Sequence, residues 1–179
     1  PSCSKVIGIH RNSLYSIDYH HPESIEASAN SVASLGPFHL IINTIGALHS
    51  EDWMPEKKLG DLNQAQLAEM FNINTIGPAL TIKYFSKLLD PTSGVMATLS
   101  AKVGSIEDNH KGGWYGYRAA KAARNMLLQT AAIEAFRQKP LAVFAALQPG
   151  TVQSGLSAKF VATEDAMTPE NSVAQMMRA

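Results

Sequence analysis

The sequence predicts an α/β domain in which helices cover both faces of a parallel sheet. Short apolar runs alternate along the chain with longer segments whose apolar residues recur at a helical spacing. This alternation is typical of parallel sheets, because the crossover between two parallel strands is usually a helix. Small and polar residues follow three of the apolar runs, which is where ligands bind in sheets of this kind.

Five segments are predicted as strands and four as helices. Continuous apolar runs such as FHLIIN suit strands that are covered on both faces. Pro22 near the first turn and Gly36-Pro37 at the end delimit the first helix, and Lys139-Pro140 ends the long one. The predicted strands are 5–10, 14–19, 38–43, 94–100 and 141–148, and the predicted helices are 22–35, about 66–89, 114–137 and about 168–179.

The composition indicates one globular domain over residues 1–179. Fifteen basic and 15 acidic residues cancel, so no net charge favours nucleic acid or a membrane surface. The chain has no run long enough to span a membrane and no secretory signal, and its one cysteine, Cys3, cannot form an internal disulfide. We therefore expect a cytoplasmic protein with an incidental thiol. The six histidines lack the spacing of a helical zinc site, so no metal is expected.

Tyr117 and Lys121 carry the strongest local signal for chemistry. Residues four apart lie on one face of a helix. An ammonium beside a phenol stabilises the phenolate and lowers the phenol pKa from its usual value of about 10. The pair can therefore donate a proton to a carbonyl or accept one from an alcohol. The spacing alone also fits an ordinary tyrosine beside a solvated lysine. The surrounding motifs are therefore needed to distinguish a catalytic pair from an ordinary one.

Several motifs occur in an order that resembles the short-chain dehydrogenase/reductase family. Asp18 ends a predicted strand, NTIG at 43–46 resembles the family's NNAG turn, and Asn74 lies within NINTIGP. YRAAK at 117–121 matches the family's YxxxK, and PGTVQS at 149–154 matches its PGxVxT. Within the family, GGWYGYRAAKAARN is most similar to the C-factor cell-signalling branch. Asn74 also continues the apolar stripe of its own helix, so its amide is expected to be buried and to need partners.

The resemblance implies a Rossmann-type fold, a cofactor that is NADP or NAD with NADP favoured, and a small carbonyl or secondary alcohol as substrate. Tyr117 would then be the acid/base, Lys121 its electrostatic partner and ribose ligand, and Asn74 the holder of a relay water. Arg11 would contact a 2′-phosphate, although a solvated surface arginine fits equally. The remaining expected cofactor-binding residues are Asp18 near the adenine, Asn43, Gly46, and Pro149, Gly150, Val152 and Ser154 around the nicotinamide, beside Tyr117 and Lys121 themselves.

The resemblance also implies a homodimer or homotetramer paired through the helices at about 66–89 and 114–137. A small-residue surface on the second helix would allow close approach. Trp114 and Tyr115 would either wall a substrate pocket or pack on a partner subunit. The small residues of that surface are Ala119, Ala120, Ala122, Ala123, Ala131 and Ala132.

Two features depart from the family pattern. The position of the family's catalytic serine is Ala101, and Ser100 stands one residue early, where a strand side chain points to the opposite face. Ser100 is nevertheless the candidate orienting group. No GxxxGxG turn occurs in the chain, so we expect the first strand–helix unit of the fold to be missing and dinucleotide binding by this chain to be weak. The sequence stops in the predicted last helix, so we also expect the last strand to be missing. An alternative is a non-catalytic, dinucleotide-binding signalling protein on the same fold.

Overall fold

The structure is a computed structural model that describes residues 4–178; Cys3 lies outside them. Its strands and helices alternate as the sequence predicts from residue 22 onward. The strands are β1 (Leu40–Asn43), β2 (Val95–Leu99) and β3 (Val143–Leu147). The α-helices are α1 (Pro22–Val32), α2 (Gln64–Phe71), α3 (Gly77–Phe85), α4 (Tyr115–Phe136) and α5 (Pro169–Met176). Single 3-10 turns extend α1 through Leu35 and α3 through Leu88.

The three strands form one parallel sheet in the order β1-β2-β3. Ile41 pairs with Met96, and Met96 with Phe144, so these three side chains point to the same face of the sheet. They pack against apolar residues of α3 and α4, which is why this face is the buried one. Side chains one position along each strand, such as Ile42 and Ala97, point to the opposite face.

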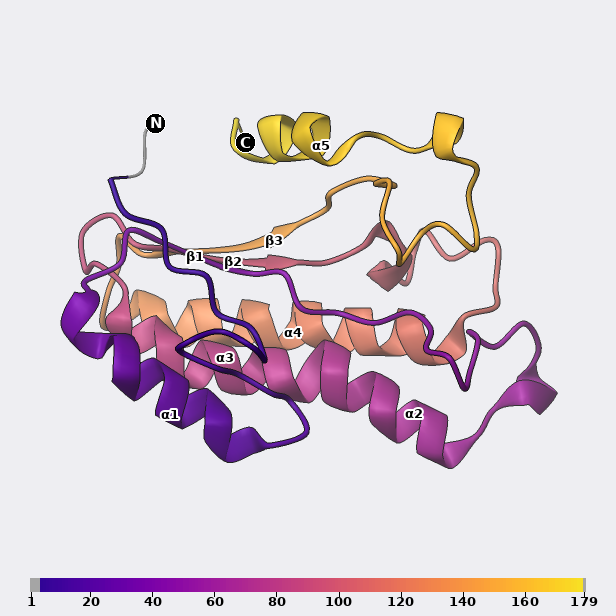
Figure 1. The fold of residues 1–179 in the computed structure, drawn as a ribbon, viewed down its shortest axis with the longest axis horizontal. Helices are drawn as coiled ribbons and strands as arrows, with labels where there is room; N and C mark the ends of the chain where they lie inside the picture. Colours follow the sequence, from indigo (N-terminus) through magenta and orange to yellow (C-terminus); the bar gives the residue numbers. More distant parts are fainter. Residues whose placement is uncertain (1–3, 179) are drawn as a thin grey trace.

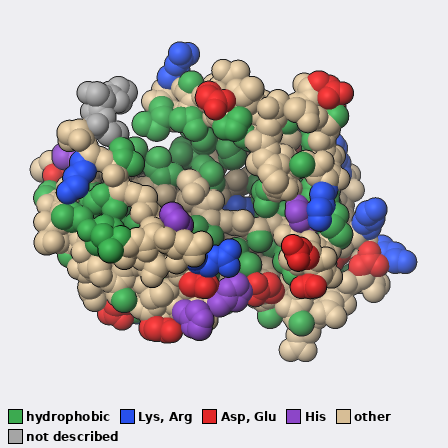
Figure 2. All heavy atoms as spheres, viewed as in Figure 1, with side chains coloured by type: hydrophobic (Ala, Val, Ile, Leu, Met, Phe, Trp, Pro, Cys, Tyr) green, Lys and Arg blue, Asp and Glu red, His purple; other side chains and the backbone are tan. Residues whose placement is uncertain are grey.

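Helices cover both faces of the sheet, as predicted, although unequally. In Figure 1, α1, α2, α3 and α4 lie together on one side of the sheet, and α5 lies on the other. Ser172 of α5 tethers that helix to the end of β3, because its hydroxyl donates to the Pro149 carbonyl at 2.7 Å. Hydrophobic side chains on the side that α5 covers are visible at the surface in Figure 2, and Val143 there is 52% exposed.

The predicted strands at 5–10 and 14–19 are wrong, because the structure has no strand in either segment. A strand needs a partner for its backbone N–H and C=O groups, and no strand of the described residues is hydrogen-bonded to these segments in the sheet. The alternating residues of 14–19 still bury their apolar side. Ile17 and Tyr19 join Ile25 and Val32 of α1 in one core cluster.

The predicted helix at about 66–89 is one continuous but irregular element. Five residues between α2 and α3, Asn72–Ile76, form a π-helical turn. Gly77 follows, and a Cβ there would come within 2.1 Å of the Tyr19 ring, so only glycine allows this contact. Within the residues that the structure describes, no helix is both long and apolar enough to cross a membrane.

Candidate active site

The first turn of α4 is fixed by a buried glutamate. Trp114 precedes the helix with a left-handed backbone (φ 53°) and supplies no side-chain cap. Glu56, only 2% exposed, replaces that cap: its Oε2 accepts the Gly116 N–H at 3.2 Å, and its backbone carbonyl accepts the Trp114 N–H. A carboxylate at a helix N-terminus satisfies free N–H groups and complements the helix dipole. Glu56 thus sets the position of the helix turn that carries Tyr117.

Tyr117 and Lys121 both lie on the buried face of α4. The Lys121 Nζ is 5.5 Å from the centre of the Tyr117 ring and donates to the Leu99 carbonyl at 2.9 Å. Burial lowers the pKa of Lys121 to about 7, with a smaller contribution from the positive charge of Arg124. Burial also raises the pKa of Tyr117, which Arg124 partly opposes. Tyr117 is therefore a protonated phenol at neutral pH.

Asn74 is completely buried within the π-helical turn, as the apolar stripe predicted. Its amide nitrogen donates to the Ala47 carbonyl at 2.9 Å and to the Met70 carbonyl at 3.1 Å, and its oxygen accepts the Ala47 N–H at 3.2 Å. A π turn frees a backbone carbonyl from the helix ladder and is frequent at functional sites. The amide thereby holds the turn that follows β1.

That turn brings Asn74 and Lys121 to the same point. A Cβ at Gly46 would lie 3.1 Å from Oδ1 of Asn74 and 3.6 Å from Nζ of Lys121. Three elements that are distant in sequence therefore converge at the carboxyl end of the sheet, which is the usual ligand edge of such folds.

Ser100 does not join this group through its hydroxyl. Its Oγ donates to Oδ1 of Asn125 on α4 at 2.6 Å. Ala101, by contrast, packs against the cluster that contains Tyr117. The alternation of strand side chains accounts for this arrangement, since Ser100 shares the face of Met96 and Thr98.

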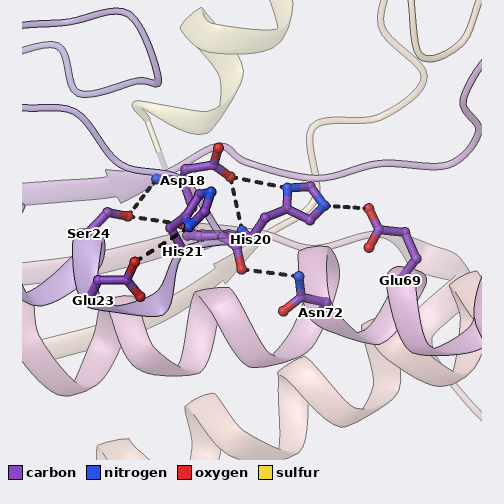
Figure 3. A network of polar contacts seen from close by, with 8 residues as sticks. Asp18, His20, His21, Glu23, Ser24, Glu69 and Asn72 are labelled. Atoms are coloured by element: carbon purple, nitrogen blue, oxygen red, sulfur yellow. Dashed lines mark hydrogen bonds and ion pairs between the residues drawn. The ribbon is translucent and has the colours of Figure 1, made fainter.

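Asp18 is held in a surface network at the start of α1 (Figure 3). Its carboxylate accepts the His20 backbone N–H at 3.0 Å and lies 3.1 Å from the His20 ring, whose other nitrogen is 2.7 Å from Glu69 of α2. The backbone hydrogen bond from His20 is the main reason that the pKa of Asp18 is lowered. The hydrogen bond to Glu69 is the main reason that the pKa of His20 is raised. Arg11 is exposed in the loop before this network.

The side chain of Asn43 is engaged inside the protein. Its amide nitrogen donates to the Tyr19 hydroxyl at 2.7 Å, and its oxygen accepts the Ile45 N–H at 3.0 Å. Tyr19 is in turn 2.9 Å from the Thr81 hydroxyl. Asn43 therefore shapes the turn that contains Gly46, and its own polar atoms are engaged by Tyr19 and Ile45.

The segment after β3 folds back over the site. Gly150 has a positive φ of 75°, and Val152 forms an isolated bridge with Met167. Ser154 lies 3.3 Å, oxygen to oxygen, from Ser157 within the same loop. Phe160 packs edge-on against Trp114 at 5.1 Å, and Trp114 against Tyr117 at 6.2 Å. Trp114 therefore walls the Tyr117 site, whereas Tyr115 is 37% exposed.

The residues around Gly46 fit a dinucleotide. The absence of a Cβ at this exposed glycine leaves room beside the Lys121 ammonium, which has no carboxylate partner among the described residues. Such a cation suits the hydroxyls of a ribose. No cluster of metal-binding side chains occurs among residues 4–178.

Two buried charged residues at the site were not predicted from the sequence. Arg124 is 1% exposed and donates to the Leu99 and Ile45 carbonyls. It lies three residues after Lys121, so its helical position was a readable signal. Glu56 gave none, because a single acidic residue in a polar loop is ordinary.

Comparison with known proteins identifies relatives over most of the chain. A family model of short chain dehydrogenases matches residues 8–165. A 1-hydroxy-2-glutathionyl-2-methyl-3-butene dehydrogenase of a Rhodococcus species is 29% identical over 163 residues, which cover 90% of this chain and 68% of the relative. The C-signal protein of Myxococcus xanthus is 32% identical over 133 residues, which cover 74% of this chain and 75% of the relative.

Solved structures share the fold. A short-chain dehydrogenase/reductase from Burkholderia multivorans with bound NADP has a TM-score of 0.76 at 21% identity, over 91% of this chain and 68% of its own. The carbonyl reductase Sniffer of D. melanogaster has a TM-score of 0.78 at 18% identity, over 91% and 67%. These similarities confirm the Rossmann-type α/β fold with a parallel sheet.

Proposed function

Because this chain belongs to the short-chain dehydrogenase/reductase family, we propose that it is an NAD(P)-dependent oxidoreductase for a small carbonyl or secondary alcohol, with Tyr117 as its acid/base. One observation carries the proposal. The turn at Gly46 brings the Asn74 amide and the Lys121 ammonium together, beside the helix face that holds Tyr117. Catalysis by positioned polar groups needs this convergence from separate elements.

In reduction, the Tyr117 hydroxyl would donate its proton to the carbonyl oxygen of the substrate. The phenol O–H bond breaks as the new alcohol O–H bond forms, and the phenolate that remains lies beside the Lys121 ammonium. Because burial raises the pKa of Tyr117, the residue is in its donating form at neutral pH. Asn74 would hold the turn and a water through which the proton is replaced.

The cofactor would lie along the carboxyl end of the sheet. Lys121 and Tyr117 would hold a ribose, Gly46 would allow its close approach, and Asp18 would lie at the adenine end. Pro149, Gly150, Val152 and Ser154 would surround the nicotinamide, which when bound supplies or accepts the hydride. Arg11, which is exposed in the loop before Asp18, would favour NADP over NAD. The B. multivorans structure named above contains NADP, which supports this choice.

A specific observation also favours a second candidate. Ala101, which packs against the Tyr117 cluster, has no hydroxyl, and the hydroxyl of Ser100 is hydrogen-bonded to Asn125. A site of this kind suits a protein that binds a dinucleotide and signals without turnover, and the M. xanthus relative carries the name C-signal. Binding of NADPH by the complete protein without its consumption would favour this candidate.

The complete protein, incubated with NADPH and a panel of small ketones and aldehydes, tests the proposal. We expect Tyr117→Phe to lower NADPH consumption by at least about 10²-fold, because it removes the proton donor. NADPH binding, measured by calorimetry, should weaken by no more than a few-fold, because Lys121 and the other cofactor contacts remain. Tyr115→Phe, two residues away and half exposed, is the matched control and should keep full activity. Activity of Tyr117→Phe within a few-fold of the wild type would place the chemistry elsewhere.

A further inference from the structure

Arg124 is a buried cation whose polar contacts are all with backbone. Its Nη2 donates to the Ile45 carbonyl at 2.9 Å, and its Nη1 donates to the Leu99 carbonyl. Its Nε is buried and has no hydrogen-bond partner among residues 4–178. A guanidinium offers five donors and keeps its charge, so a buried arginine normally lies against a carboxylate or a phosphate. Here the two terminal nitrogens of the guanidinium, which form a planar fork, instead link the end of β2 to the turn after β1.

No described carboxylate compensates this charge. The four ion pairs of the described residues involve only His20, His21, Lys102 and their acidic partners. The ionisable groups that influence Arg124 are the phenols of Tyr19 and Tyr117, and Arg124 in turn influences Lys121. Glu56 lies at the start of α4, where it is bonded to Gly116. Two buried cations therefore share one face of α4 without an anion.

Lys121 and Arg124 also converge on one atom. Both donate to the carbonyl oxygen of Leu99, so the ammonium and the guanidinium lie within hydrogen-bonding reach of the same point. Like charges so close together in a buried site repel each other, and the charge of Arg124 opposes the protonation of Lys121. The repulsion between the two buried positive charges is offset if a negative charge forms nearby during the reaction. The phenolate of Tyr117 is such a charge.

We propose that Arg124 is a positioning residue of this site, which supplies a second positive charge behind the Tyr117–Lys121 pair. This inference rests on the proposed function for its catalytic meaning, although the charge can be tested without turnover. The guanidinium stabilises the Tyr117 phenolate and, by repulsion, makes the Lys121 ammonium easier to deprotonate. The guanidinium also holds the Leu99 carbonyl in place, and this carbonyl is the hydrogen-bond acceptor of Lys121.

The sign of the effect follows for both groups. Removing a positive charge disfavours the phenolate and favours the ammonium, so the pKa of Tyr117 and the pKa of Lys121 should both rise. The rate of carbonyl reduction should fall at high pH as Lys121 loses its proton, since burial places the Lys121 pKa at about 7. We call this part of the pH profile its high-pH limb. Without the Arg124 charge, this limb should move to higher pH.

The test uses the complete protein with Arg124→Met, which removes the charge and keeps an apolar stem that suits a buried position. Arg137→Met, at the exposed end of the same helix, is the matched control. Arg124→Lys keeps the charge without the fork. The first readout is the pH profile of carbonyl reduction. The second is the ionisation of Tyr117, obtained as the ultraviolet difference titration of each protein minus its Tyr117→Phe counterpart.

We expect Arg124→Met to move both the high-pH limb and the Tyr117 titration upward by about one pH unit. Arg124→Lys should leave both near their wild-type positions, and Arg137→Met should change neither. An unmoved Tyr117 titration in Arg124→Met, or an equal movement in Arg137→Met, would overturn the inference. If Arg124→Met does not fold, Arg124→Gln is the neutral replacement.

The two proposals fail in different ways. A wild-type protein that never consumes NADPH overturns the proposed function, whereas the Tyr117 titration still decides the role of Arg124. If the protein is active but the Tyr117 titration is the same in Arg124→Met as in the wild type, only the present inference is overturned.

Discussion

Ala101 packs against the core cluster that contains Tyr117, and under the proposed function a hydroxyl donor there would stabilise the oxyanion that develops on a carbonyl substrate. It packs against the same cluster as Tyr117, Leu48 and Met70, so the position faces the site. The adjacent hydroxyl of Ser100 is directed to Asn125 instead. A hydrogen-bond donor that is aimed at a developing charge is among the strongest contributions to catalysis.

We therefore predict that Ala101→Ser raises the turnover of the complete protein, by about tenfold. The added hydroxyl needs only one more atom at a half-buried position, so the fold should tolerate it. Steady-state kinetics with any accepted carbonyl measures the effect, and Ser105→Ala in the exposed loop beyond serves as the control. An unchanged or lower rate would mean that the developing charge is stabilised by another group.

The orientation of single side chains could be predicted only where a regular period applies. The face of Ser100 follows from the alternation of a strand, and the burial of Asn74 follows from the helical stripe of Met70 and Phe71. Asn43 also lies on a strand, but its partner is Tyr19, from a segment whose position no local pattern determines. The role of Glu56 depends on a contact with Gly116, sixty residues away.

Among the elements, helices and covered strands were predicted well, and the N-terminal strands were not. Periodicity and the stop signals at Gly36 and Pro140 define α1 and α4 closely, because a helix satisfies its own backbone groups. A strand depends on a neighbour that the local sequence does not encode. The segments 5–10 and 14–19 have strand-like composition but find no such neighbour in the described structure.

The small-residue surface predicted on α4 is only partly at the surface. Ala120 is fully buried, and Ala131 packs against the core cluster of Met96 and Leu128. The outward face of α4 instead carries large apolar side chains, including Met126 at 68% and Phe136 at 67% exposed. Apolar side chains in such a row are a feature of subunit contacts.

We predict that the complete protein is a homodimer or larger assembly that uses the outward face of α4. Met126→Lys should shift it toward monomer, because it places a charge in the apolar contact. Sedimentation velocity at micromolar concentration measures the change. Leu14→Lys is the control, since Leu14 is 89% exposed, more than Met126, and lies in the N-terminal loop. A wild-type monomer at that concentration would contradict the prediction.

In the whole molecule, the parallel sheet explains why remote segments share one site. The strands of a parallel sheet end at the same edge, so the turns at Ile45, Ser100 and Gln148 are neighbours although they are far apart in sequence. This consequence of topology could be predicted from the sequence. The path of the loop that places Phe160 against Trp114 could not, because its contacts are side-chain specific.

Transfer of deuterium from NADPH in which both hydrogens on nicotinamide C4 are replaced by deuterium tests the central claim most directly. The complete protein is incubated with this cofactor and a carbonyl that it accepts, and the alcohol product is examined by mass spectrometry. We predict that each alcohol molecule carries one deuterium on its former carbonyl carbon, and that Tyr117→Phe forms almost none of this product. Alcohol without deuterium, or equal labelled product from Tyr117→Phe, would contradict a hydride transfer that depends on the Tyr117 proton.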